Sequence, residues 1–91
     1  MKYTVRKGVV SREICGEHLL IATLDAQKYC PYSTVINGDA AFVWECVAGG
    51  ATDEEVVAAV AGEYEQPEEA VRDAVMALLG RLVSQGFLIE S

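Results

Sequence analysis

The chain of 91 residues has few of the residues that build disulfide and metal sites: three cysteines and a single histidine, His18. Cys15, Cys30 and Cys46 stand far apart, and no C-x-x-C pair occurs. An odd, dispersed set does not form a disulfide framework, and a zinc site would require all three cysteines to converge with the histidine. We therefore expect free thiols in a reducing compartment, and neither a metal nor any other cofactor.

Long apolar runs are also absent, and none approaches the roughly 20 residues that a membrane-spanning helix requires. The amino-terminal segment MKYTVRKGVV carries charges but no apolar stretch after them, so it does not have the form of a signal peptide. We expect a cytoplasmic protein without a membrane partner. A chain of this length has too little core for a second domain, so residues 1–91 are expected to form one domain.

Positive charge is scarce, especially in the later part of the chain. The net charge is −7, from seven Lys and Arg against 14 Asp and Glu. Residues 1–36 carry five basic and three acidic residues, a balance of +2, whereas residues 37–91 carry two and eleven, a balance of −9. Because an acidic surface repels phosphate, a nucleic-acid role would have to rest on the first third of the chain.

The first third predicts three short strands. The runs VVSREI at 9–14 and HLLIATL at 18–24 flank Gly16, which can supply the positive φ of a tight hairpin turn. The second run is apolar on both faces, so we expect it at the centre of the sheet. After a loop over 25–32, the β-branched residues of STVI predict a third strand over 33–36.

Helical periodicity begins directly after this strand. Asn37 is placed to cap a helix whose apolar residues recur at i, i+3, i+4 and i+7, and Gly49-Gly50 ends it. Thr52 and Glu55 have the spacing of a capping box, which predicts the start of a second helix. Asn37 would thus end a strand and start a helix without any linker, which fixes the angle between them.

The third predicted helix runs from Pro67 to about Gln85, with Gly86 as the glycine that follows its end. It carries more apolar surface than one core stripe needs. The core stripe consists of Val71, Val75, Leu78 and Leu82. One flank consists of Met76, Leu79 and Val83, and the other flank consists of Ala70, Ala74 and Ala77. An exposed apolar flank indicates a binding surface, and a fully buried helix is the alternative.

The order of elements indicates an α+β, winged-helix-like domain: a three-stranded antiparallel sheet followed by three helices, with FLIES as a short extended tail. If the strand over 33–36 lies at an edge, its backbone N–H and C=O groups are free to pair. An extended peptide can add to such an edge while the adjacent helix holds its side chains. The same edge can pair with a second copy, which would give a homodimer.

Four segments, covering nearly the whole chain, carry a family resemblance: VVSREICGEHLLIAT, VINGDAAFVWE, GATDEEVVAAVAGEY and VMALLGRLVSQGFLIE. In this order and spacing they resemble the PqqD-like family, also called RiPP recognition elements. The most specific combination is the signature from Asn37 to Trp44 together with the leucine-rich last helix and GFLIE. Many members have an acidic residue where this chain has Ala74, so the role of that acid is not carried over.

The resemblance implies a non-catalytic winged-helix domain. Such a domain binds the leader segment of a ribosomally made precursor peptide and presents it to a modifying enzyme, often a radical SAM protein. The leader adds antiparallel to the third strand, in the cleft beside the third helix. On this chain the implied peptide-binding residues are Ser33, Thr34, Val35, Ile36, Arg72, Val75, Met76, Leu79 and Val83.

Two other functional classes fit the sequence less well. An enzyme is disfavoured because the chain has no G-x-S-x-G motif, no glycine-rich phosphate loop and no paired Cys/His motif. The alternative is a winged-helix DNA-binding transcriptional regulator, whose recognition helix should carry Lys or Arg toward the groove. The segment DEEVVAAVAGEY has no positive charge, so we expect no nucleic-acid partner.

Overall fold

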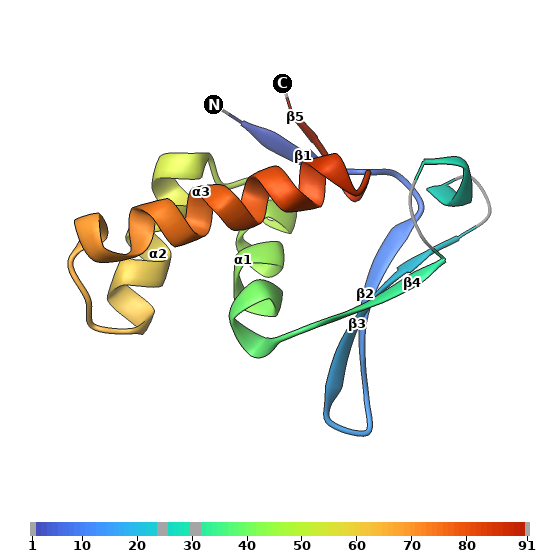
Figure 1. The fold of residues 1–91 in the computed structure, drawn as a ribbon, viewed down its shortest axis with the longest axis horizontal. Helices are drawn as coiled ribbons and strands as arrows, with labels where there is room; N and C mark the ends of the chain where they lie inside the picture. Colours follow the sequence, from blue (N-terminus) through green and yellow to red (C-terminus); the bar gives the residue numbers. More distant parts are fainter. Residues whose placement is uncertain (1, 24–25, 30–31, 91) are drawn as a thin grey trace.

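The structure is a computed structural model that describes residues 2–23, 26–29 and 32–90. Its elements are β1 (Tyr3–Val5), β2 (Val9–Ile14), β3 (Glu17–Ala22), the 3-10 helix η1 (Ala26–Lys28), β4 (Ser33–Ile36), α1 (Gly38–Ala48), α2 (Asp53–Glu63), α3 (Glu68–Ser84) and β5 (Leu88–Glu90). Figure 1 shows α3 lying across α1 and α2, with the β2–β3 hairpin projecting away from the helices. The predicted α+β fold, a three-stranded antiparallel sheet followed by three helices, is confirmed.

The main sheet has the order β2-β3-β4, with both strand pairs antiparallel. The run predicted over 18–24 forms β3 over 17–22 and occupies the centre of the sheet, as its two apolar faces indicated. Cys15 and Gly16 both have positive φ, 53° and 81°, which matches the twist of a two-residue hairpin turn. The hairpin is therefore confirmed at the predicted turn.

A second, two-stranded sheet was not predicted in full. β1 pairs with β5, with Tyr3 opposite Glu90 and Val5 opposite Leu88. The sequence indicated an extended tail at residues 87–91 but not its partner strand at the start of the chain. Tyr3, Phe87 and Leu88 are buried in the core, so this pairing closes one side of the domain. The predicted loop over 25–32 also contains the short helix η1, which the sequence analysis did not foresee.

The junction between β4 and α1 has the predicted capping geometry. Asn37 is extended, with φ −80° and ψ 174°, and its side-chain oxygen accepts a hydrogen bond from the Ala40 N–H (2.7 Å). Its backbone carbonyl accepts from the Ala41 N–H (3.0 Å), which makes the first helical hydrogen bond. One residue thus ends β4 and starts α1, so the direction of the helix is fixed relative to that of the strand.

The caps of the other helices agree with the sequence to within one residue. The Thr52–Glu55 capping box is present at the start of α2, with both reciprocal hydrogen bonds formed. Pro67 is the N-cap of α3 and lies one residue outside the helix, rather than in its first turn. Gly86 has φ 91° after the end of α3, which is the left-handed conformation expected for a glycine there.

Replacing Asn37 by Ala should lower the free energy of unfolding by about 1 kcal/mol, because the Ala40 N–H loses its acceptor. Urea denaturation followed by circular dichroism measures the change. The control is Asn37→Asp, which keeps an acceptor oxygen at the same position and should stay near the wild-type value. An Asn37→Ala protein that unfolds at the wild-type midpoint would show that the cap contributes nothing.

Candidate functional site

β4 is an edge strand, and only every second residue of it directs its backbone groups toward β3. Which residues these are decides which backbone groups are free. In an antiparallel pair, hydrogen-bonded residue pairs alternate with pairs that are not hydrogen-bonded to each other. The Ala22 N–H donates to the Tyr32 carbonyl oxygen (2.8 Å), in continuation of the β3–β4 register. Tyr32 therefore directs its backbone groups toward β3. Because the pattern repeats every two residues, Thr34 and Ile36 do the same.

Ser33 and Val35 are therefore the residues whose backbone N–H and C=O groups point away from β3. In the ranges that the structure describes, no strand pairs with this side of β4. Their side chains lie on the solvent-facing side of the sheet, and Val35 is 61% exposed. The side chains of Thr34 and Ile36 lie on the other face, together with the buried Leu20 opposite Thr34. The edge thus offers backbone hydrogen bonds from two residues, without a competing strand among the described residues.

A groove of about 370 Å³ runs beside this edge, between β4 and α3. The residues that line it come from β4, from the start of α1 and from the second half of α3: Thr34, Val35, Ile36, Asn37, Asp39, Ala40, Ala74, Leu78, Arg81, Leu82 and Gln85. On α3 they recur at helical spacing and form one stripe, in which Ala74 leaves space because its side chain is small. The groove contains one acidic lining residue, Asp39, and one basic one, Arg81.

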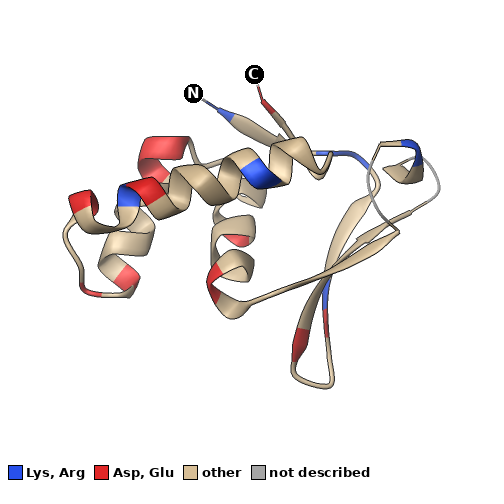
Figure 2. Ribbon diagram, in the orientation of Figure 1, with Lys and Arg blue, Asp and Glu red and all other residues tan. Residues whose placement is uncertain are grey.

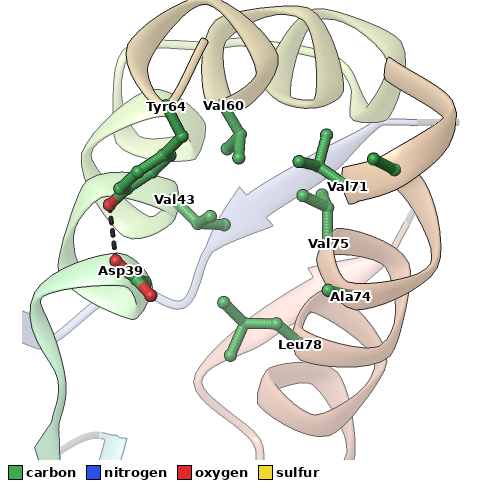
Figure 3. A pocket seen from close by; sticks show the side chains of 9 residues that line it. Asp39, Val43, Val60, Tyr64, Val71, Ala74, Val75 and Leu78 are labelled. Atoms are coloured by element: carbon green, nitrogen blue, oxygen red, sulfur yellow. Dashed lines mark hydrogen bonds between the residues drawn. The ribbon is translucent and has the colours of Figure 1, made fainter. Parts of the chain in front are cut away.

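An apolar cavity of about 220 Å³ adjoins the groove, between α1, α2 and α3 (Figure 3). Asp39, Ala74 and Leu78 line both hollows, so the two lie next to each other. The remaining walls are almost entirely aliphatic, with only the phenol of one tyrosine added: Val43, Val60, Tyr64, Ala70, Val71 and Val75. A cavity with such walls fits an apolar side chain rather than a charged one.

One hydrogen bond bounds this cavity on the side of α1 and α2. The Tyr64 hydroxyl donates to the Asp39 carboxylate (2.5 Å), as the dashed line in Figure 3 shows. This hydrogen bond is the main cause of a raised pKa for Tyr64, since the carboxylate stabilises the protonated phenol. Phe42 packs edge-on against the same ring, with centroids 6.3 Å apart. These contacts fix the tyrosine ring as a wall of the cavity.

The flank of α3 that the sequence analysis placed in the binding site faces the interior instead. Leu79 is completely buried, and Met76 and Val83 are partly buried against the core cluster. The prediction of an exposed flank is therefore wrong for Leu79. The physical reason is that α3 packs on α2 and on β5, and β5 belongs to the small sheet that the sequence did not reveal. The other flank, with Ala70, Ala74 and Ala77, is the exposed one.

Arg72 is also separated from the groove, because it is engaged with α2. Its guanidinium donates to the Glu54 carboxylate (2.7 Å) and lies 3.6 Å from the Glu68 carboxylate one turn earlier. The hydrogen bond from Arg72 holds the pKa of Glu54 below its usual value. This ion pair connects α2 to α3 on the surface and leaves the arginine no direct role at β4.

The structure thus divides the predicted site residues into two groups. Thr34, Val35 and Ile36 line the groove, Ser33 lies on the free edge, and Val75, although only 3% exposed, lines the apolar cavity. The predicted residues of α3 that line neither hollow are Arg72, Met76, Leu79 and Val83. The groove residues of α3 were not predicted, although their common stripe on one helix face was an available signal: Ala74, Leu78, Arg81, Leu82 and Gln85. The groove residues at the start of α1 were also missed: Asn37, Asp39 and Ala40.

The described residues offer no metal site and no membrane span. In residues 2–23, 26–29 and 32–90, no group of three or more His, Cys, Asp or Glu side chains is arranged so that it could hold a metal ion. Cys15 is exposed at the hairpin tip and Cys46 is half-buried, each with a free thiol. Cys30 and Pro31, which belong to the loop predicted before the third strand, lie outside the described residues. Within the same ranges, each helix is too short or too polar to cross a bilayer.

The chain has relatives among known proteins. A sequence profile of the family described as coenzyme PQQ synthesis protein D (PqqD) matches residues 31–88. Two solved structures share the fold. TbiB1 in complex with the TbiA(beta) leader peptide has a TM-score of 0.79 and 20% identity over 97% of this chain and 96% of that one. Lasso peptide synthetase B1 complexed with the leader peptide has a TM-score of 0.79 and 16% identity over 99% and 100%. No curated protein matches significantly.

The burial of Leu79 predicts that Leu79→Asp prevents folding. Burying an unpaired carboxylate costs several kcal/mol, which approaches the whole stability of a small domain. The control is Ala77→Asp, which introduces the same residue at an exposed position of the same helix and should leave the fold intact. Circular dichroism and thermal denaturation distinguish the two. A folded Leu79→Asp protein with wild-type stability would show that this flank is open to solvent.

Proposed function

Since the chain belongs to the PqqD family, we propose that it binds an extended peptide, the leader segment of a ribosomally made precursor. The observation that carries this proposal is the free edge of β4, with Ser33 and Val35 directed outward, beside a groove and an apolar cavity. The two similar structures, which are complexes with leader peptides, support it further. Peptides that add to an exposed sheet edge gain affinity from backbone hydrogen bonds and specificity from side-chain pockets.

The bound peptide would form a fourth strand, antiparallel to β4. Backbone groups of Ser33 and Val35 would each exchange hydrogen bonds with the peptide, in the alternation that antiparallel pairing imposes. Every second peptide side chain would then point toward α3, and the others toward the solvent side, beside Val35. An antiparallel peptide passes the start of α1 first and the beginning of β4 last, so its amino-terminal part meets the apolar cavity.

We propose that the domain is non-catalytic and needs no cofactor. Its role would be to hold the leader and present the remainder of the precursor to a modifying enzyme, such as a radical SAM protein. Binding through backbone groups at one edge leaves the rest of a precursor chain free for that enzyme. The same edge of β4 can serve a second copy only when the peptide is absent, so homodimerisation through β4 would compete with peptide binding.

The charge distribution opposes the alternative, a DNA-binding regulator. Figure 2 shows acidic residues on all three helices and, among these helices, basic residues only on α3, although a winged-helix protein would place its recognition surface on a helix. Asp53, Glu54 and Glu55 occupy the first turn of α2, which therefore begins with three carboxyl groups. Such a surface repels the phosphate backbone. We accordingly propose no nucleic-acid partner.

Val35→Pro tests the role of the edge backbone. Proline removes the outward N–H at this position but no hydrogen bond to β3, and it should weaken peptide binding at least about fivefold. The ligand is a synthetic copy of a peptide selected from a displayed random library against the wild-type domain, and calorimetry gives the affinity. The control is Val35→Ala, which shortens the same side chain and keeps the N–H. Equal affinities for the Pro and Ala variants would remove β4 from the proposal.

Ala74→Phe tests the groove. Ala74 lines both the groove and the cavity and is exposed, so a phenyl ring there fills their junction without disturbing the core. We expect the selected peptide to lose at least about tenfold in affinity. Ala77→Phe is the control, because Ala77 is exposed on the same helix but lines neither hollow. If both variants bind the peptide as the wild type does, the peptide does not pass between β4 and α3.

A further inference from the structure

We infer that the groove recognises one side chain of the bound peptide by its charge. This side chain is a carboxylate that Arg81 holds. It follows, in the direction of the peptide's carboxyl terminus, the apolar anchor, which is the peptide side chain that occupies the apolar cavity. This inference rests on the proposed function and adds to it a chemical requirement on the ligand. Arg81 is the one basic residue among those that line the groove. It lies level with β4, whereas the apolar cavity lies toward the amino-terminal half of α3.

The two arginines of α3 differ in how their charge is satisfied. Arg72 has the carboxylates of Glu54 and Glu68 as partners. Arg81 is exposed and forms no ion pair with any side chain in the described ranges. The positions three and four residues away on either side of it are occupied by Ala77, Leu78, Ser84 and Gln85, and none of these is acidic. Although the chain has a net charge of −7, no acidic side chain among the described residues forms an ion pair with this arginine.

A guanidinium next to a free strand edge suits a carboxylate more than any other peptide group. It presents several N–H donors in a fixed plane and binds a carboxylate oxygen pair with two parallel hydrogen bonds. The other groove residues near it, Thr34, Leu82 and Gln85, are uncharged and do not compete for it. Arg81 also lies in the last turn of α3, where a positive charge suits the helix dipole. That structural role requires only a positive charge at this position and does not involve a ligand.

The geometry also gives the spacing of the two recognised side chains. The cavity lining on α3 is centred near Ala74, and Arg81 follows seven residues later, about 10 Å along the helix. An extended peptide covers this distance in about three residues. Because side chains on one face of a strand alternate, the acidic residue should stand two or four residues after the apolar anchor. The order, apolar first and acidic second, follows from antiparallel addition to β4.

The test compares peptides selected from one random displayed library by the wild-type domain and by Arg81→Glu. The wild type should enrich Asp or Glu at a fixed offset after an apolar residue, and Arg81→Glu should enrich Lys or Arg at that same offset. A synthetic wild-type ligand whose acidic residue is changed to Lys should lose about five- to tenfold in affinity for the wild type. Arg81→Glu should recover that loss.

Two further variants distinguish recognition by Arg81 from an effect of net charge and from an effect on the stability of the domain. Arg12→Glu makes the same change in net charge on the β2–β3 hairpin, outside the groove lining, and should select the same peptides as the wild type. Arg81→Lys keeps the positive charge at the helix end, so its thermal stability should equal that of the wild type. Its preference for the acidic residue should persist in weaker form, because lysine lacks the planar pair of donors.

The outcomes distinguish this inference from the proposed function. Peptides that bind the wild type without any acidic preference, or identical selections by wild type and Arg81→Glu, would overturn the inference and leave peptide binding intact. If neither folded protein enriches any peptide, the proposed function fails and the charge reading fails with it. Swapped preferences at one fixed offset would support both.

Discussion

The backbone groups at the outer edge of β4 are the constraint on which the rest of this structure depends. Ser33 and Val35 must direct their N–H and C=O groups outward because Thr34 and Ile36 use theirs to pair with β3. An unpaired strand edge is a hazard for aggregation, and proteins limit it by keeping such strands short. Here β4 ends after four residues at Asn37, where α1 begins at once. The capped junction therefore keeps the edge short and holds it beside α3.

Local features of the chain were sufficient to predict most of the fold. Asn37 and the Thr52–Glu55 box are caps whose partners lie within a few residues, so spacing alone identifies them. The hairpin turn at Gly16 depends on the φ angle of adjacent residues in the same way. The pairing of β1 with β5 joins the two ends of the chain, and short runs such as Tyr3–Val5 carry no local signal of a distant partner. Without that pairing, the environment of α3 could not be assigned.

The candidate site illustrates the same limit at the level of single side chains. Helical periodicity fixes only the angles between residues of α3 and not the direction that each one faces. Val75 and Leu82 of the predicted core stripe are buried, but Val71 and Leu78 are only partly buried, and Leu79 from a predicted flank belongs to the core. Once β5 and α2 cover Leu79, the side of α3 that carries Ala74 must face the groove. The sequence likewise shows two arginines in α3. Only the structure shows that Arg72 forms an ion pair with Glu54, whereas Arg81 forms none within the described part of the chain.

The small β1–β5 sheet has a consequence for how this domain can be combined with other proteins. It pairs Tyr3 near one end of the chain with Glu90 near the other, and Figure 1 shows β1 and β5 side by side at a distance from β4. Attaching another polypeptide to either end would leave the ligand groove unobstructed. The whole domain could be inserted into a surface loop of a host protein whose two insertion points lie close together. The architecture is therefore suited to being a portable module.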